Sequence, residues 1–158
     1  MLVLCLKLFG RISEIHQPER KNSMALIIDL KPGEKILVGT AVITNDSQRT
    51  RLHIAGDAPI LREKDIMKEE DATSPCKKIY FLIQCMYMSH RPDEYFKKYF
   101  NLIQEIQTAA PSTAVHFAVI NEKILAGHYY QAMKEARELI RYEEELIDNA
   151  QNPDAASA

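Results

Sequence analysis

The sequence has few glycines, few cysteines and almost no net charge. Its five glycines in 158 residues leave little room for a loop that cradles phosphates. The three cysteines, Cys5, Cys76 and Cys85, fit no zinc spacing, and they favour a reducing, cytoplasmic compartment over a disulfide framework. Its 20 basic and 22 acidic residues give a net charge of −2, which excludes a polycation that coats DNA. No apolar run is long enough for a transmembrane helix, so we expect no membrane partner.

Patterns for catalysis or metal binding are lacking as well. His116 lies in an apolar stretch, where a core histidine is commoner than a base or a ligand. Cys76 stands at an expected helix start, where the helix dipole lowers the pKa of a thiol, but no histidine or aspartate neighbours it. The acidic runs 69–71 and 143–145 lack calcium or zinc spacing and indicate solvated faces. We expect no enzyme, no catalytic residue, no metal and no cofactor.

The first 23 residues differ in pattern from the rest. An apolar run at 2–6 precedes the basic residues and no small-residue cleavage site follows, so a secretory signal is not indicated. Met24 opens a well-patterned segment. We interpret residues 1–23 as a non-native or flexible extension, the alternative being an N-terminal element that packs on the body.

Residues 24–66 have the pattern of a small antiparallel β module. Turn signals at 31–34, 45–47 and 56–59 separate short β-rich runs. From residue 49 to residue 54 the chain alternates as a half-buried strand does. One face carries Thr50, Leu52 and Ile54, and the other carries Arg49, Arg51 and His53. A last strand is expected over 60–64. So small a module is marginal alone and needs a partner surface.

A polar connector at 67–76 leads to a helical pattern, so the fold class is α+β, with a bundle of about four helices at 77–150 and a flexible tail at 151–158. The first helix, 77–89, is apolar almost all round, which predicts a homo-oligomer or an obligate complex. The second is expected to bury Phe96, Tyr99, Ile103 and Ile106. The third carries Val115, Phe117, Ile120, Ile124 and Leu125. The last, 128–148, carries Tyr129, Met133, Ala136, Ile140 and Ile147 on one face.

The polar face of the β module is the candidate binding surface. Arg49, Arg51 and Arg62 are candidates for RNA contacts, with Lys31 and Lys64 as supporting charges, because guanidinium groups bind phosphate and stack on splayed bases. Arg62 and Lys64 are expected on a common strand face. We expect the arginines to be exposed and to contribute little to stability.

A salt-bridged solvent face explains the same residues equally well. Its acidic partners would be Asp57, Glu63 and Asp65. Residues 24–66 carry six basic and six acidic groups, so the net charge of the module does not decide between the two interpretations.

Six short motifs along the chain form a recognisable set. They are Met24-Ala25-Leu26, Leu30-Lys31-Pro32-Gly33-Glu34, Arg49-Thr50-Arg51-Leu52, residues 60–67, Lys77-Lys78-Ile79-Tyr80-Phe81 and residues 127–134. As a set they resemble the FlbT family of bacterial flagellar regulators, over about residues 24–147. The resemblance implies a post-transcriptional repressor that associates with the 5′ leader of flagellin messenger RNA and promotes its degradation.

A weaker similarity links residues 31–39 and 58–63 to the strand pattern of the translational regulator CsrA, an intertwined β dimer that binds RNA leaders. That family pairs an arginine early in its first strand with an arginine in its last strand. Arg62 falls on the latter position, whereas Leu30 stands at the former and departs from the pattern. The similarity implies a CsrA-like β module.

The implied partners are the flagellin messenger leader and, through the helices, a second copy of the chain, another flagellar regulator or a nuclease. The alternative is a helical protein-interaction adaptor or chaperone-like factor in flagellar assembly, with only indirect effects on RNA. The net charge of −4 over residues 92–150 (six basic and ten acidic residues) favours that alternative.

Overall fold

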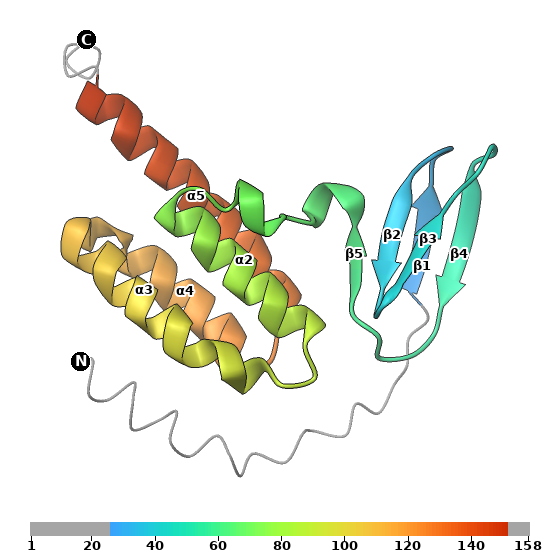
Figure 1. Cartoon of the computed structure of the whole chain (residues 1–158), viewed down its shortest axis with the longest axis horizontal. Coiled ribbons are helices and arrows are strands. Elements are labelled where there is room, and N and C mark those ends of the chain that lie inside the picture. The colour runs from blue at the N-terminus through green and yellow to red at the C-terminus, as the bar shows by residue number, and fades with distance from the viewer. Residues whose placement is uncertain (1–25, 152–158) are drawn as a thin grey trace.

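The computed structural model describes residues 26–151, in which five strands are followed by four α-helices (Figure 1). The strands are β1 (Leu26–Leu30), β2 (Lys35–Val38), β3 (Ala41–Thr44), β4 (Thr50–Ile54) and β5 (Ile60–Arg62). The helices are α2 (Pro75–Met88), α3 (Phe96–Ala109), α4 (Ala114–Leu125) and α5 (Tyr129–Gln151). The α+β class and the four helices are confirmed. The expected N-terminal extension lies outside the described residues, as does the expected tail from residue 152 onward.

The strands form two small antiparallel sheets. β1 pairs with β4, and β2 lies between β3 and β5. Ile28 and Leu30 from one sheet and Ile36 from the other form the buried core of the module. The two-residue turn between β2 and β3 contains Gly39, whose φ of 57° lies in the left-handed region that favours glycine. Three buried side chains make a small core, consistent with a module that needs support from the rest of the chain.

The last strand is shorter than expected. β5 ends at Arg62, and a 3-10 turn, η2 (Glu63–Asp65), follows it. The turn carries the Asp65 side chain inward, where it is 5% exposed and pairs with Arg137 of α5. The expected common strand face for Arg62 and Lys64 is therefore wrong.

The start of α2 is fixed by two side chains. Ser74 caps the helix, its Oγ accepting from the Lys77 N–H at 3.2 Å. Glu143 of α5 accepts from the Ser74 hydroxyl and, at 3.1 Å, from the Cys76 N–H. A carboxylate at a helix N-terminus also complements the helix dipole. Glu143 is thus not part of a solvated run, and burial together with Glu143 raises the pKa of Cys76 to about 12, whereas the sequence predicted a lowered pKa.

The four helices share one apolar core. α2 packs against α3 and α5, and α4 packs against α5. The expected stripe of α3 is confirmed at Tyr99, Ile103 and Ile106, which are buried. Phe117, Ile120 and Ile124 of α4 are buried as expected, but Val115 is 72% exposed and Leu125 is exposed too, because a helix with apolar residues on most sides does not reveal its buried face.

The expected face of the last helix is confirmed at Met133 and Ala136, which are buried, and at Tyr129 and Ile140, which pack against the core, but it is wrong at Ile147. α5 buries Ala132, Met133, Ala136 and Leu139. Ile147 is exposed because the C-terminal part of α5 runs past the start of α2 (Figure 1). No helix within residues 26–151 is both long enough and apolar enough to span a membrane.

The β module is bound to the helices through β5 and the connector. The Arg137 Nη2 donates to Asp65 Oδ1 at 2.6 Å and to the Tyr80 hydroxyl at 3.0 Å, and that hydroxyl donates to the Asp65 carbonyl at 2.6 Å. Gln84 makes two hydrogen bonds of 2.8 Å to the Met67 backbone. Leu61 is buried in the helical core. α2 and α5 thus supply the partner surface that the small module requires.

Candidate nucleic-acid interface

The outer face of the β1–β4 sheet carries Arg51. The strand register places Asp29 of β1 directly opposite Arg51 of β4. The Arg51 Nε donates to Asp29 Oδ1 at 2.8 Å, and its Nη2 donates to Oδ2 at 3.4 Å. Leu52 and Ile54 are half-buried against the module core, so the expected alternation of this strand is confirmed. The Arg51 side chain remains 64% exposed and has further N–H donors for a ligand.

Arg49 lies beside this pair, in the loop that leads into β4. With Asp29, Thr50 and Arg51 it lines a shallow surface depression. Among residues 26–151, no carboxylate lies within ion-pair distance of the exposed Arg49. The Arg51 hydrogen bond, helped by the charges of Arg49 and Arg62, lowers the pKa of Asp29. Arg49 therefore contributes the uncompensated positive charge of this depression.

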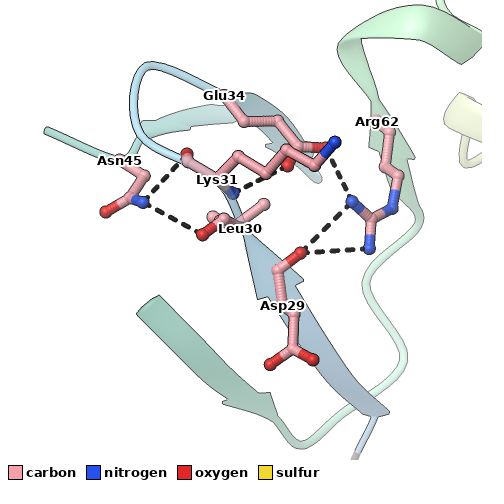
Figure 2. A network of polar contacts seen from close by, with 6 residues as sticks. All are labelled: Asp29, Leu30, Lys31, Glu34, Asn45 and Arg62. Atoms are coloured by element: carbon pink, nitrogen blue, oxygen red, sulfur yellow. Dashed lines mark hydrogen bonds and ion pairs between the residues drawn. The ribbon is translucent and has the colours of Figure 1, made fainter. Parts of the chain in front are cut away.

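Arg62 is in a different situation, shown in Figure 2. Its Nη1 lies 2.6 Å from Glu34 Oε1, and both terminal nitrogens donate to the Asp29 carbonyl at 3.3 Å. The side chain is only 33% exposed. The expectation of an exposed arginine is therefore wrong for Arg62, and we now expect it to contribute to stability, because it joins β5 to β1 and to the turn after β1.

The 31–34 turn and the loop before β4 are held together by Asn45. Its Nδ2 donates to the carbonyls of Leu30 at 3.1 Å, of Lys31 at 2.9 Å and of Gln48 at 2.6 Å (Figure 2 shows the first two). The Lys31 N–H donates to Glu34 Oε2 at 3.0 Å; this bond and Arg62 lower the pKa of Glu34. Asn45 thereby fixes the loop that presents Arg49, a role that its place in a turn did not reveal.

The supporting charges and the acidic partners are placed differently from expectation. Lys31 and Lys64 are both exposed, Lys31 at the turn after β1 and Lys64 in η2, so they do not share a strand with the arginines. Arg51 pairs with Asp29, and Arg62 pairs with Glu34. Neither arginine pairs with the expected Asp57, Glu63 or Asp65. Two features of the sequence could have indicated these partners. Asp29 is the one charged residue of β1, and Glu34 closes the Lys-Pro-Gly-Glu turn.

The Arg62→Ala variant is expected to melt about 3 to 6 °C lower than the wild type, because the Asp29 carbonyl and Glu34 both lose a charged donor. Arg51→Ala, at a more exposed pair, should change the melting temperature by no more than about 2 °C. Thermal unfolding followed by circular dichroism at neutral pH measures both. Equal melting temperatures for the two variants would contradict the assigned role of Arg62.

The same carboxylates predict a dependence on pH. Since the pKa values of Asp29 and Glu34 are lowered by folding, their contribution to stability is present above the ordinary carboxyl pKa and is lost as the pH falls through the lowered values. The melting temperature of the wild type should therefore fall below about pH 4, and that of Arg62→Ala should fall less over the same range.

Other chemistry is not evident in residues 26–151. No group of three histidine, cysteine, aspartate or glutamate side chains there is placed to hold a metal ion. The His116 ring lies 4.8 Å from the Tyr142 ring, centroid to centroid, and is half-buried. This placement agrees with a packed histidine.

Comparison with known proteins identifies the family. The family model described as flagellar protein FlbT matches residues 26–147. The chain belongs to the FlbT family. The FlbT resemblance of the six motifs is thereby confirmed, whereas the CsrA similarity stays a prediction. No solved structure matches the chain.

Curated relatives cover most of the chain. A probable flagellum biosynthesis repressor protein FlbT 1 from Bradyrhizobium diazoefficiens is 50% identical over 124 residues, which cover 78% of this chain and 85% of the relative. A probable repressor FlbT from Rhodopseudomonas palustris is 44% identical, over 78% of this chain and 98% of the relative. The flagellum biosynthesis repressor FlbT of Caulobacter vibrioides is 32% identical, over 78% and 90%.

Proposed function

We propose that this chain represses flagellum biogenesis after transcription, by associating with the 5′ leader of a flagellin messenger RNA and promoting its degradation. The names of its relatives support the repression. The RNA part rests on the depression around Arg49 and Arg51, where one guanidinium has no acidic partner among the described residues and the other keeps free donors. The proposal assigns no catalytic step to the chain.

The charged residues have different roles in this proposal. Arg49 and Arg51 contact phosphates or splayed bases of a single-stranded segment, since guanidinium groups serve both purposes. Lys31 and Lys64 add positive charge at the margin. Arg62 acts chiefly by holding β1, β5 and the 31–34 turn in place, so its effect on binding is largely indirect. The helices offer the surface to which a nuclease or another flagellar regulator docks.

A leader-fused reporter tests this function in a flagellated bacterium that lacks its own copy of the chain. Expression of the wild type should shorten the half-life of the reporter messenger, and Arg49→Ala/Arg51→Ala should restore it. Lys97→Ala/Lys98→Ala, which removes two exposed lysines from α3, is the matched control and should behave like the wild type. A half-life that the wild type leaves unchanged would contradict the proposed degradation step.

A protein-interaction adaptor is the second candidate, and one observation favours it. α4 exposes three large apolar side chains that do not contribute to the helical core. They are Val115 (72% exposed), Val119 (37%) and Leu125 (46%). A Val115→Lys variant that loses repression, while Arg49→Ala/Arg51→Ala keeps it, would favour the adaptor.

A further inference from the structure

β3 is an unusually unprotected edge strand. Edge strands of natural sheets carry charges, prolines or bulges that prevent pairing with other chains. Of the edge strands that the structure describes, β1 carries Asp29, β4 carries Arg51 and β5 carries Arg62. β3, with the sequence Ala-Val-Ile-Thr, carries neither charge nor proline, and all four of its residues are exposed. Its Val42 is 64% exposed and its Ile43 is 37% exposed.

The alternation of hydrogen-bonded and non-hydrogen-bonded pairs in the β2–β3 hairpin shows which backbone groups of β3 are not bonded to β2. The Asn45 N–H donates to the Glu34 carbonyl at 2.9 Å, so residues 34 and 45 form a hydrogen-bonded pair. Such pairs alternate along an antiparallel ladder, so the pairs of Lys35 with Thr44 and of Leu37 with Val42 are not hydrogen-bonded. The N–H and C=O groups of Val42 and Thr44 therefore point away from β2, at the open edge.

We propose that β3 pairs antiparallel with β3 of a second copy of this chain. A two-fold axis through Ile43 places Val42 opposite Thr44 of the partner subunit, and those are the residues whose backbone groups point outward. Ile43 then faces Ile43 of the partner subunit as a non-hydrogen-bonded pair, in which side chains approach most closely. The result is one continuous sheet of strands β5-β2-β3 from each copy.

The chemistry of the edge selects a second copy as the occupant. β3 has no cation for a nucleic-acid backbone, so its edge does not suit RNA. Ile43 lies on the same sheet face as Ile36, the buried residue of β2, so its pairing extends the small module core across the interface. Four-residue strands bury less surface than the roughly 1,200 Å² of a standard interface, so we expect a dissociation constant in the micromolar range.

Disulfide trapping tests the register. Ile43→Cys places two thiols on facing positions of a non-hydrogen-bonded pair, within the Cα separation that a disulfide accepts. Under mild oxidation it should form covalent dimers about tenfold faster than Val115→Cys, an exposed valine on α4 with the same native cysteines as background. Cross-linking of Ile43→Cys at the rate of Val115→Cys would overturn the proposal.

Sedimentation velocity gives a second readout. The Val42→Pro variant removes an outward N–H without removing a β2–β3 hydrogen bond, and should raise the dissociation constant about tenfold or more. Val42→Thr keeps the N–H and should associate like the wild type. A wild-type chain that is monomeric up to about 0.5 mM would overturn the proposal. If circular dichroism shows that Val42→Pro is unfolded, the Ile43→Cys result decides.

Discussion

The Arg137→Gln variant should lose about 3 kcal/mol of unfolding free energy, because it leaves a buried carboxylate without its charged partner. Asp65 is 5% exposed, and Arg137 also donates to the Tyr80 hydroxyl. Since the Arg137 side chain is 42% exposed, the loss lies at the lower end for buried pairs. Thermal unfolding should show a melting temperature lower by about 6 to 12 °C.

A neighbouring arginine on α5 provides the control. Arg141 pairs with Glu138 on the exposed surface of the same helix. Arg141→Gln should change the unfolding free energy by about 0.5 kcal/mol or less. A loss below about 1 kcal/mol for Arg137→Gln would contradict the view that this pair binds the β module to the helices.

The Arg49→Ala/Arg51→Ala variant should bind a flagellin leader about 25-fold more weakly at about 0.1 M salt. Each lost phosphate contact on single-stranded RNA makes the slope of log K against log salt shallower by about 0.7, which corresponds to about fivefold per contact at that concentration. The slope should therefore be shallower by about 1.4. Filter binding over a salt series measures both quantities.

The control for this variant is again Lys97→Ala/Lys98→Ala, which removes the same formal charge from α3. It should keep the affinity and the slope of the wild type. Circular dichroism should show that the arginine variant is folded, because both side chains are largely exposed. An unchanged affinity in the folded arginine variant would shift the assignment to the adaptor function.

Local patterns predicted the local structure well. The alternation of β4 follows from a period of two, and the stripe of α3 follows from a helical period with one polar face. Ser74 followed by Pro75 is a helix-start signal, and α2 begins there, two residues before the expected helix at 77–89. Each of these signals depends only on residues close together in the sequence.

Such local patterns could not predict the ion pairs or the buried face of α4. Arg51 meets Asp29 through strand register, and Arg137 meets Asp65 across 72 residues of chain. In the sequence, Glu143 is one of three consecutive acids that indicate a solvated face. The packing of α5 on α2 instead places it at the start of α2. α4 carries apolar residues on most sides, so only its neighbours decide which of them are buried.

In the proposed function this chain binds the flagellin leader through phosphate contacts. An electrophoretic shift of the leader by the wild-type chain, repeated over a salt titration, tests it most directly. We expect a complex whose log K falls with log salt at a slope between about −1.4 and −3.5, corresponding to two to five contacts on single-stranded RNA. The absence of a complex at low salt with micromolar protein would contradict this binding mode. A complex whose affinity does not change with salt would contradict it as well.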